Sequence, residues 1–209
     1  MSDSTQGSEK HYSAIDDPLH ELAHHTTLPR TSLSNWLDAV IDRIGSLASW
    51  LWVITVGFIL YSVISRYAFS QGSVMLEEIQ WHLAGAAWLV GLSYTFVHDD
   101  HVRVDVLHER LSLKSQAWIE CFGILLLLLP FLVFALIEVT PYAFSSFQQG
   151  EHSQAPNGLP YRWILKSFLP LSMILLIVAA FSRLLKTTAL LFGFPHPLSP
   201  ETTPSEKGD

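Results

Sequence analysis

The sequence has little charge and almost no cysteine. Only 15% of its 209 residues are charged, whereas roughly a quarter of the residues in an average soluble domain are. This deficit argues against an ordinary cytosolic enzyme. The single cysteine, Cys121, cannot form an internal disulfide, and there is no CxxC metal or redox motif. The net charge is −7 and no basic cluster is available for a phosphate backbone, so we expect no nucleic-acid partner.

Signatures of catalysis and of ion coupling are missing as well. The chain has no P-loop and no GxSxG motif. An ion-coupled carrier needs ionisable groups or broken helices near the middle of the bilayer, and the apolar runs carry no acid or base there. A transmembrane haem needs axial histidines, and His82 has no intramembrane partner. We therefore expect no catalytic residue, no cofactor and no metal site.

The sequence does contain four long apolar runs. The first would extend about 33 Å as a helix at 1.5 Å per residue, which matches a hydrocarbon core of about 30 Å. Pro130 is expected to kink the third run. The predicted transmembrane spans are residues 44–65, 79–97, 118–137 and 164–185.

More polar segments surround these spans. Apolar residues recur at helical spacing from Leu33 to Ile44, with polar residues on the opposite face, which predicts an amphipathic helix at the membrane surface. We expect a disordered cytoplasmic tail over 1–32, a membrane domain over 33–193, and a second disordered cytoplasmic tail over 194–209. The predicted fold class is an all-α integral membrane protein with four transmembrane helices plus an N-terminal interfacial amphipathic helix.

The distribution of basic residues predicts the orientation. Nine of the 12 Lys and Arg residues lie before the first span, in the loop between the second and third spans, or from Arg183 to the end of the chain. Cytoplasmic loops carry an excess of Lys and Arg. We therefore expect both termini to be cytoplasmic.

Arg66, Glu77 and Glu78 form a candidate charge set at the outer face. Arg66 ends the first span and the two glutamates begin the second, so the connecting turn can bring opposite charges together. Pairing is strengthened where the site is partly desolvated. The sequence predicts a structural ion pair or partner contact here, with exposed, unpaired charges as the alternative.

Two histidine-containing motifs suggest metal binding at first sight. The stretch His20-Glu21-Leu22-Ala23-His24 matches the H-E-x-x-H pattern of zinc proteases. It lies in a polar tail between two prolines, so we interpret it as part of a solvated tail, with adventitious metal binding as the alternative. His101, Arg103 and Asp105 follow the second span and fit no EF-hand spacing. We expect them to form a cytoplasmic turn held by caps and salt bridges.

Small residues recur at four-residue spacing along the second span. Ala87, Gly91 and Thr95 would share one helix face. Such a stripe lets a neighbouring helix approach closely. We expect it to serve helix packing, within this chain or against another protein.

Short motifs follow one another in an informative order. Arg66-Tyr67-Ala68-Phe69 ends the first span, Glu77-Glu78 begins the second, Gly91 to Tyr94 precedes a turn, and His101-Val102-Arg103-Val104-Asp105 follows it. Together, from about Leu33 to Gly193, the chain resembles the small permease subunit of tripartite ATP-independent periplasmic (TRAP) transporters.

The resemblance implies partners and a function. It implies a multi-pass protein of the bacterial inner membrane, in contact with membrane lipid, a large permease subunit on a separate chain and a periplasmic substrate-binding protein. The large subunit would carry the sodium and substrate sites, and the small subunit would brace it during uptake of a small organic solute such as an organic acid. The outer loop between the third and fourth spans is a candidate contact for the binding protein. From the residues alone, a self-sufficient small membrane channel or the membrane anchor of a redox enzyme remain alternatives.

Overall fold

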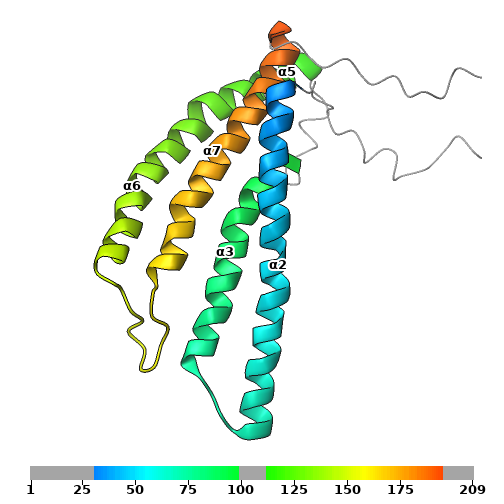
Figure 1. Cartoon of the computed structure of the whole chain (residues 1–209). Helices are drawn as coiled ribbons and strands as arrows, with labels where there is room; N and C mark the ends of the chain where they lie inside the picture. Colours follow the sequence, from blue (N-terminus) through cyan, green and yellow to red (C-terminus); the bar gives the residue numbers. More distant parts are fainter. Residues whose placement is uncertain (1–30, 99–111, 195–209) are drawn as a thin grey trace, which may run out of the picture.

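The computed structural model describes residues 31–98 and 112–194, and this part of the chain is entirely helical, with short connections (Figure 1). The predicted tails over 1–32 and 194–209, the H-E-x-x-H motif and the turn at His101, Arg103 and Asp105 lie wholly or almost wholly outside the described residues. The expected all-α class is confirmed. The helical elements are α2 (Ser32–Phe69), α3 (Val74–His98), α5 (Leu113–Phe122), the π-helical η1 (Gly123–Leu128), α6 (Leu129–Gln148) and α7 (Trp163–Phe192).

The first helix, α2, begins with a capping box. The Ser34 amide donates to the Thr31 hydroxyl and the Thr31 amide donates to the Ser34 hydroxyl, which satisfies two backbone donors that a helix start leaves free. The helix then continues without a break to Phe69 and ends at Ser70, which has a left-handed backbone. The amphipathic segment from Leu33 is therefore the first turns of α2, and the expectation of a separate interfacial helix is not confirmed. No proline interrupts Ser32–Phe69, so nothing in the local sequence stops the helix.

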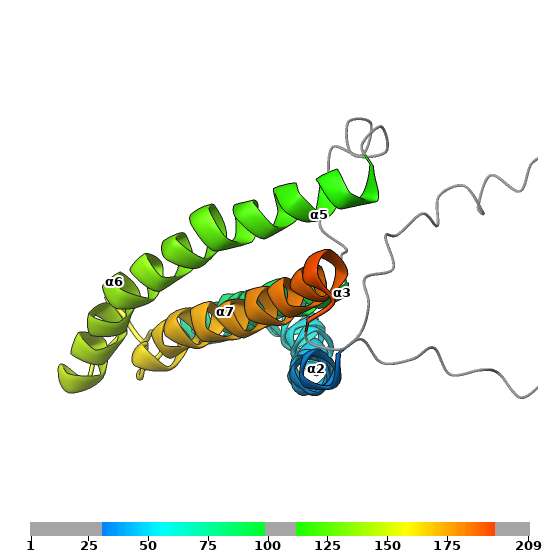
Figure 2. The ribbon, with the colours of Figure 1, turned by 90° about the horizontal axis from the view of Figure 1, so that it is seen from above.

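The third predicted span is longer than expected and changes its helical form. α5, η1 and α6 follow one another directly, and Figure 2 shows them along an arc. Pro130 lies immediately after the π-helical turn, within the first turn of α6. Because proline has no N–H to donate to the preceding turn, a local π-helical adjustment beside it re-routes the backbone hydrogen bonds. A π-helical segment over Gly123–Leu128 thus lies beside Pro130, and the kink expected at this proline stays a prediction.

The helices form one open layer. Figure 1 shows them side by side in the order α6, α7, α3, α2. α2 packs on α3, α3 on α7, and α7 on α6, and α2 also packs directly on α7 at the end where Ser182 contacts Asp38. A small core lies where η1, α6 and α7 meet, built around Ile124, Leu132 and Ala180. We call the end near Ser32 and Phe192 the terminal end, and the end with the α2–α3 turn and the α6–α7 loop the loop end (Figure 1).

Three of the helical stretches are long and apolar enough to cross a membrane. They are Ser32–Phe69, Lys114–Gln148 and Trp163–Phe192, and they contain the predicted spans 44–65, 118–137 and 164–185. The remaining predicted span, 79–97, which is the second along the chain, is helical but is not among these three. Its helix carries Gln80, His82 and Ser93 among its apolar residues, which lowers its apolar character. α3 nevertheless lies between α2 and α7 in the layer (Figure 1).

Gly45 permits the closest approach between α2 and α3. A Cβ added there would lie 2.8 Å from both Cβ and Cγ of Tyr94, closer than real Cβ contacts come. Gly57, on the same helix, has nothing within 4 Å of an added Cβ. The two glycines therefore differ in whether the fold depends on a missing side chain.

We predict that Gly45→Ala destabilises the protein and that Gly57→Ala does not. Overpacking at Gly45 should cost about 1–3 kcal/mol, which outweighs the gain in helix propensity of up to about 1 kcal/mol that both substitutions share. Thermal unfolding of the two variants in the same detergent measures the difference. Equal unfolding temperatures would contradict the close packing of α2 on α3.

Candidate functional site

The two glutamates at the start of α3 face different partners. Glu77 pairs with Arg66 at the end of α2, across the turn between the helices. Both side chains of this pair are about half exposed, at 50% and 54%. Exposed ion pairs contribute little to stability because water and salt screen them. The structure thus brings Arg66 and Glu77 together and directs Glu78 elsewhere.

Glu78 holds the loop between α6 and α7. Its carboxylate accepts hydrogen bonds from the Ser153 hydroxyl and from the Leu159 backbone N–H, and the residue is only 8% exposed. Gly158 makes this contact possible, since an added Cβ there would lie 2.9 Å from the Glu78 Oε2. An ionised acceptor makes stronger hydrogen bonds than a neutral one. Glu78 therefore joins the start of α3 to a loop more than seventy residues later in the chain.

Glu151 fixes the same loop from the other side. Its carboxylate accepts hydrogen bonds from Lys166 on α7 and from the Ser146 hydroxyl on α6, and its backbone carbonyl accepts from the Arg162 N–H at 3.1 Å. The hydrogen bonds from Lys166 and Ser146 hold the pKa of Glu151 below its ordinary value of 4.5. The Lys166 ammonium also lies 4.1 Å from the centre of the Tyr142 ring. The loop is thus tied to three helices.

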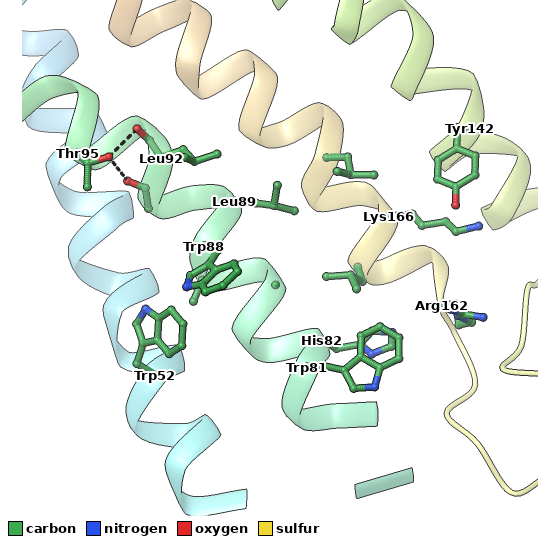
Figure 3. Close-up of a pocket in the computed structure, with 15 residues that line it drawn as sticks. Trp52, Trp81, His82, Trp88, Leu89, Leu92, Thr95, Tyr142, Arg162 and Lys166 are labelled. Carbon is green, nitrogen blue, oxygen red and sulfur yellow. Dashed lines mark hydrogen bonds between the residues drawn. The ribbon is translucent and has the colours of Figure 1, made fainter. Parts of the chain in front are cut away.

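A large apolar groove crosses the face of the layer (Figure 3). Its volume is about 840 Å³, and its lining comes from α2, α3, α6 and α7. Ala87, Gly91 and Thr95 all line it, so the predicted packing stripe borders open space in this chain. An added Cβ at Gly91 would meet nothing within 4 Å. The tight glycine contacts between helices lie instead at Gly45 and, less closely, at Gly85, where an added Cβ would be 3.3 Å from Leu165 Cδ1.

Sequence reasoning missed a group of charged residues at the terminal end. Lys186 on α7 pairs with Asp38 on α2, and the Ser182 hydroxyl donates to the same carboxylate at 2.6 Å. Arg183 pairs with Glu120 on α5 and is buried. The Arg183 side chain thus turns into the protein. The sequence does show acidic residues, Asp38 and Glu120, that could pair with these cations. Spacing along the chain, however, does not show which helices are neighbours.

Metal-ligating residues do not gather in the described ranges. No group of three or more His, Cys, Asp or Glu side chains placed to hold a metal occurs among residues 31–98 and 112–194. Cys121 is buried and has no disulfide. The Nδ1 of His82 lies 2.7 Å from the Glu78 carbonyl, while its Nε2 is buried without a hydrogen-bond partner. Within the described residues, the chemistry of the site is therefore hydrogen bonding and charge pairing at the loop end, above an apolar groove.

We predict that Glu78→Gln loosens the α6–α7 loop and that Glu77→Gln does not. The Ser153 hydroxyl and the Leu159 N–H both donate to the ionised carboxylate of Glu78, and a neutral amide cannot replace that acceptor for both. The ion pair between Glu77 and Arg66 is exposed, so its loss should matter little. Hydrogen exchange of the amides in 151–162 should become at least severalfold faster in Glu78→Gln. Similar exchange in the two variants would refute the anchoring role of Glu78.

We also predict that the loop loosens only in acid. Because the folded pKa of Glu151 is lowered, its contribution to loop order is present above the ordinary pKa and is lost as the pH falls through the folded value. A nitroxide spin label at the exposed position His152 reports this through its mobility. The label should stay immobile from neutral pH down to 4.5, the ordinary pKa, and become mobile only at a pH below that. In Glu151→Gln it should be mobile throughout; a mobility change near neutral pH in the unsubstituted loop would contradict the assignment.

Comparison with known proteins identifies the family. A search of curated proteins gave no match. A family model described as "Tripartite ATP-independent periplasmic transporters, DctQ component" matches residues 55–190, which is more than half of the chain. The matched range includes the Arg66–Glu77 pair, Glu78, the anchored loop and all of the groove except Trp52. With three helices long and apolar enough to cross a membrane, the chain is a multi-pass membrane protein. It belongs to the family of DctQ components, the small membrane components of tripartite ATP-independent periplasmic transporters.

Proposed function

We propose that this chain braces a large permease subunit, carried on a separate chain, for sodium-driven uptake of a small organic solute. The solute class we propose is an organic acid, delivered by a periplasmic binding protein. The family places the chain in a three-component transporter. The division of labour proposed here gives the moving and ion-binding parts to the large subunit and a fixed position to this one.

The observation that carries this proposal is the exposed apolar surface of the open layer. Only 6% of the most apolar window of α2 is buried, against 22% for α7. Large side chains such as Trp50, Leu60 and Ile64 on α2 contact no other part of the described chain closely enough to be covered. Lipid can solvate such a surface, but small residues and shape-matched faces favour association with other membrane helices. A bracing subunit needs a broad surface of this kind, and a carrier with its own solute path does not.

The placement in the membrane is part of the proposal. We place the chain in the bacterial inner membrane with both termini in the cytoplasm, because basic residues favour that side. This puts the loop end, with Glu78 and Glu151, on the periplasmic side. We also propose that α3 is a fourth span, since it lies between the apolar helices α2 and α7.

The anchored loop is the proposed contact for the binding protein. Residues 149–162 lie at the loop end and are held by Glu78 and Glu151, so they would present a fixed shape to the periplasm. A pre-organised loop loses less conformational entropy when it binds. Docking of the binding protein should therefore weaken in Glu78→Gln and persist in the matched variant Glu77→Gln.

We predict that the chain co-purifies with a separate large polytopic membrane protein. The experiment is affinity purification from native membranes in mild detergent, followed by mass spectrometry of the recovered proteins. The bracing role predicts near-equal amounts of the two chains. Uptake in liposomes should need both chains, the binding protein and an inward sodium gradient.

Two results would overturn this reading. Recovery of the chain alone as a defined homo-oligomer that transports by itself would favour a small channel. A visible haem Soret band in the purified protein would favour a redox anchor. Solute uptake that is indifferent to the sodium gradient would contradict the proposed coupling and leave the bracing role standing.

A further inference from the structure

The groove has the length and lining of a site for an acyl chain. It follows α3 from Trp81 to Thr95, about 21 Å at 1.5 Å per residue. One leaflet of a bilayer provides about 15 Å of hydrocarbon, half of a core of about 30 Å. The walls are apolar, with Leu165 and Leu169 on α7 and the paired rings of Trp52 and Trp88 at the α2 side (Figure 3). An unbranched apolar chain therefore fits the groove along its length.

The floor of the groove is open because it is built from small residues. Gly91 has nothing within 4 Å of an added Cβ, and Gly85 and Ala87 line the same surface. Empty space lined by apolar side chains is available to apolar ligands. The space is therefore a property of the backbone of α3 and does not depend on a side chain moving aside.

The loop end of the groove carries a cation that makes no direct ion pair within the described residues, although its charge acts on the nearby carboxylates of Glu78 and Glu151. Arg162, at the N-cap of α7, lies with its guanidinium carbon 5.9 Å from the centre of the Trp81 ring. Lys166 is paired with Glu151, but within the described ranges no carboxylate lies within ion-pair distance of Arg162. The buried Nε2 of His82, which lines the same end, is also without a partner. Figure 3 shows Arg162, Trp81 and His82 at this end of the groove.

We propose that this groove binds a phospholipid, with one acyl chain along α3 and the phosphate at Arg162. The groove is apolar and opens between helices that are apolar enough to span a membrane, so its occupant comes from the bilayer. The guanidinium at its rim supplies the charge that complements a phosphate, and Arg binds phosphate oxygens through two parallel hydrogen bonds. An apolar helix of a partner protein would fill the groove but would bring no anion into contact with this guanidinium, whereas a phospholipid supplies one.

The test compares phospholipid retention in four variants of the full chain. The protein, with any subunit that co-purifies, is isolated from native membranes in mild detergent, and phospholipid is quantified by native mass spectrometry. Gly91→Leu fills the groove where the structure has room, and Gly57→Leu adds the same side chain to an open, exposed position on α2 outside the groove. Arg162→Gln removes the rim cation, and Arg66→Gln removes a cation at the loop end that lies outside the groove.

We expect tightly retained phospholipid in the unsubstituted protein, in Gly57→Leu and in Arg66→Gln. Gly91→Leu should lose it, and Arg162→Gln should retain about tenfold less, as expected for loss of a charge-assisted hydrogen bond. Inorganic phosphate should not displace the lipid, because the acyl chain contributes most of the buried apolar contact. Displacement by phosphate alone would show an anion site at Arg162 and overturn the acyl-chain assignment.

Three other results would overturn the proposal. The first is equal retention of phospholipid in Gly91→Leu and Gly57→Leu. The second is that the unsubstituted protein retains no phospholipid. The third is that Gly91→Leu loses a co-purifying membrane subunit while its phospholipid content is unchanged. The last would assign the groove to a protein helix. If Gly91→Leu fails to fold, the comparison of Arg162→Gln with Arg66→Gln decides the question alone.

Discussion

The carboxylate of Glu78 joins the two halves of the layer at the loop end. One half is the pair α2 and α3, and the other is the pair α6 and α7 with the loop between them. Glu78 begins the second helix of the first pair and accepts two hydrogen bonds from the loop of the second. At the other end, Asp38 accepts from Lys186 and Ser182, so the first and last helices are also joined. The buried core between these two groups of polar contacts is small. The polar contacts therefore help to hold the helices side by side.

An open layer is a costly shape for an isolated protein in water and a reasonable one in a membrane. In lipid, apolar side chains need no cover, and helices satisfy their own backbone hydrogen bonds. What a membrane does not tolerate cheaply is an unpaired charge. The described part of the chain answers this by pairing Arg183 with Glu120, Lys186 with Asp38 and Lys166 with Glu151. The result is a subunit with a broad exposed apolar surface in which these three cations are paired.

The sequence predicted the helices better than it predicted their neighbours. Apolar runs revealed all four helical stretches because periodicity and length are local properties. The helices α2 and α7 continue beyond the predicted spans, because a helix need not end where its uncharged core ends. Arg66 and the two glutamates were singled out from their positions around one turn. That Glu78 would turn toward Ser153 and Leu159 could not be predicted, because the loop lies at a distance along the chain that no local pattern encodes. The stripe at Ala87, Gly91 and Thr95 was recognised as a surface of small residues, but whether such a surface is filled depends on the spacing of whole helices.

The contact between Asp38 and Ser182 constrains the order in which the chain can be assembled. The two residues are 144 positions apart, so α2 leaves the ribosome long before its partner on α7 exists. The turn between α2 and α3 is short, and these helices can form a hairpin as soon as both are inserted. The Glu78 contacts come next, when the α6–α7 loop is complete, and the closing of α7 on α2 must come last. Until Lys186 has been synthesised and α7 packs on α2, the Asp38 carboxylate has no lysine to pair with, so an incomplete chain carries an unpaired acid on its first helix.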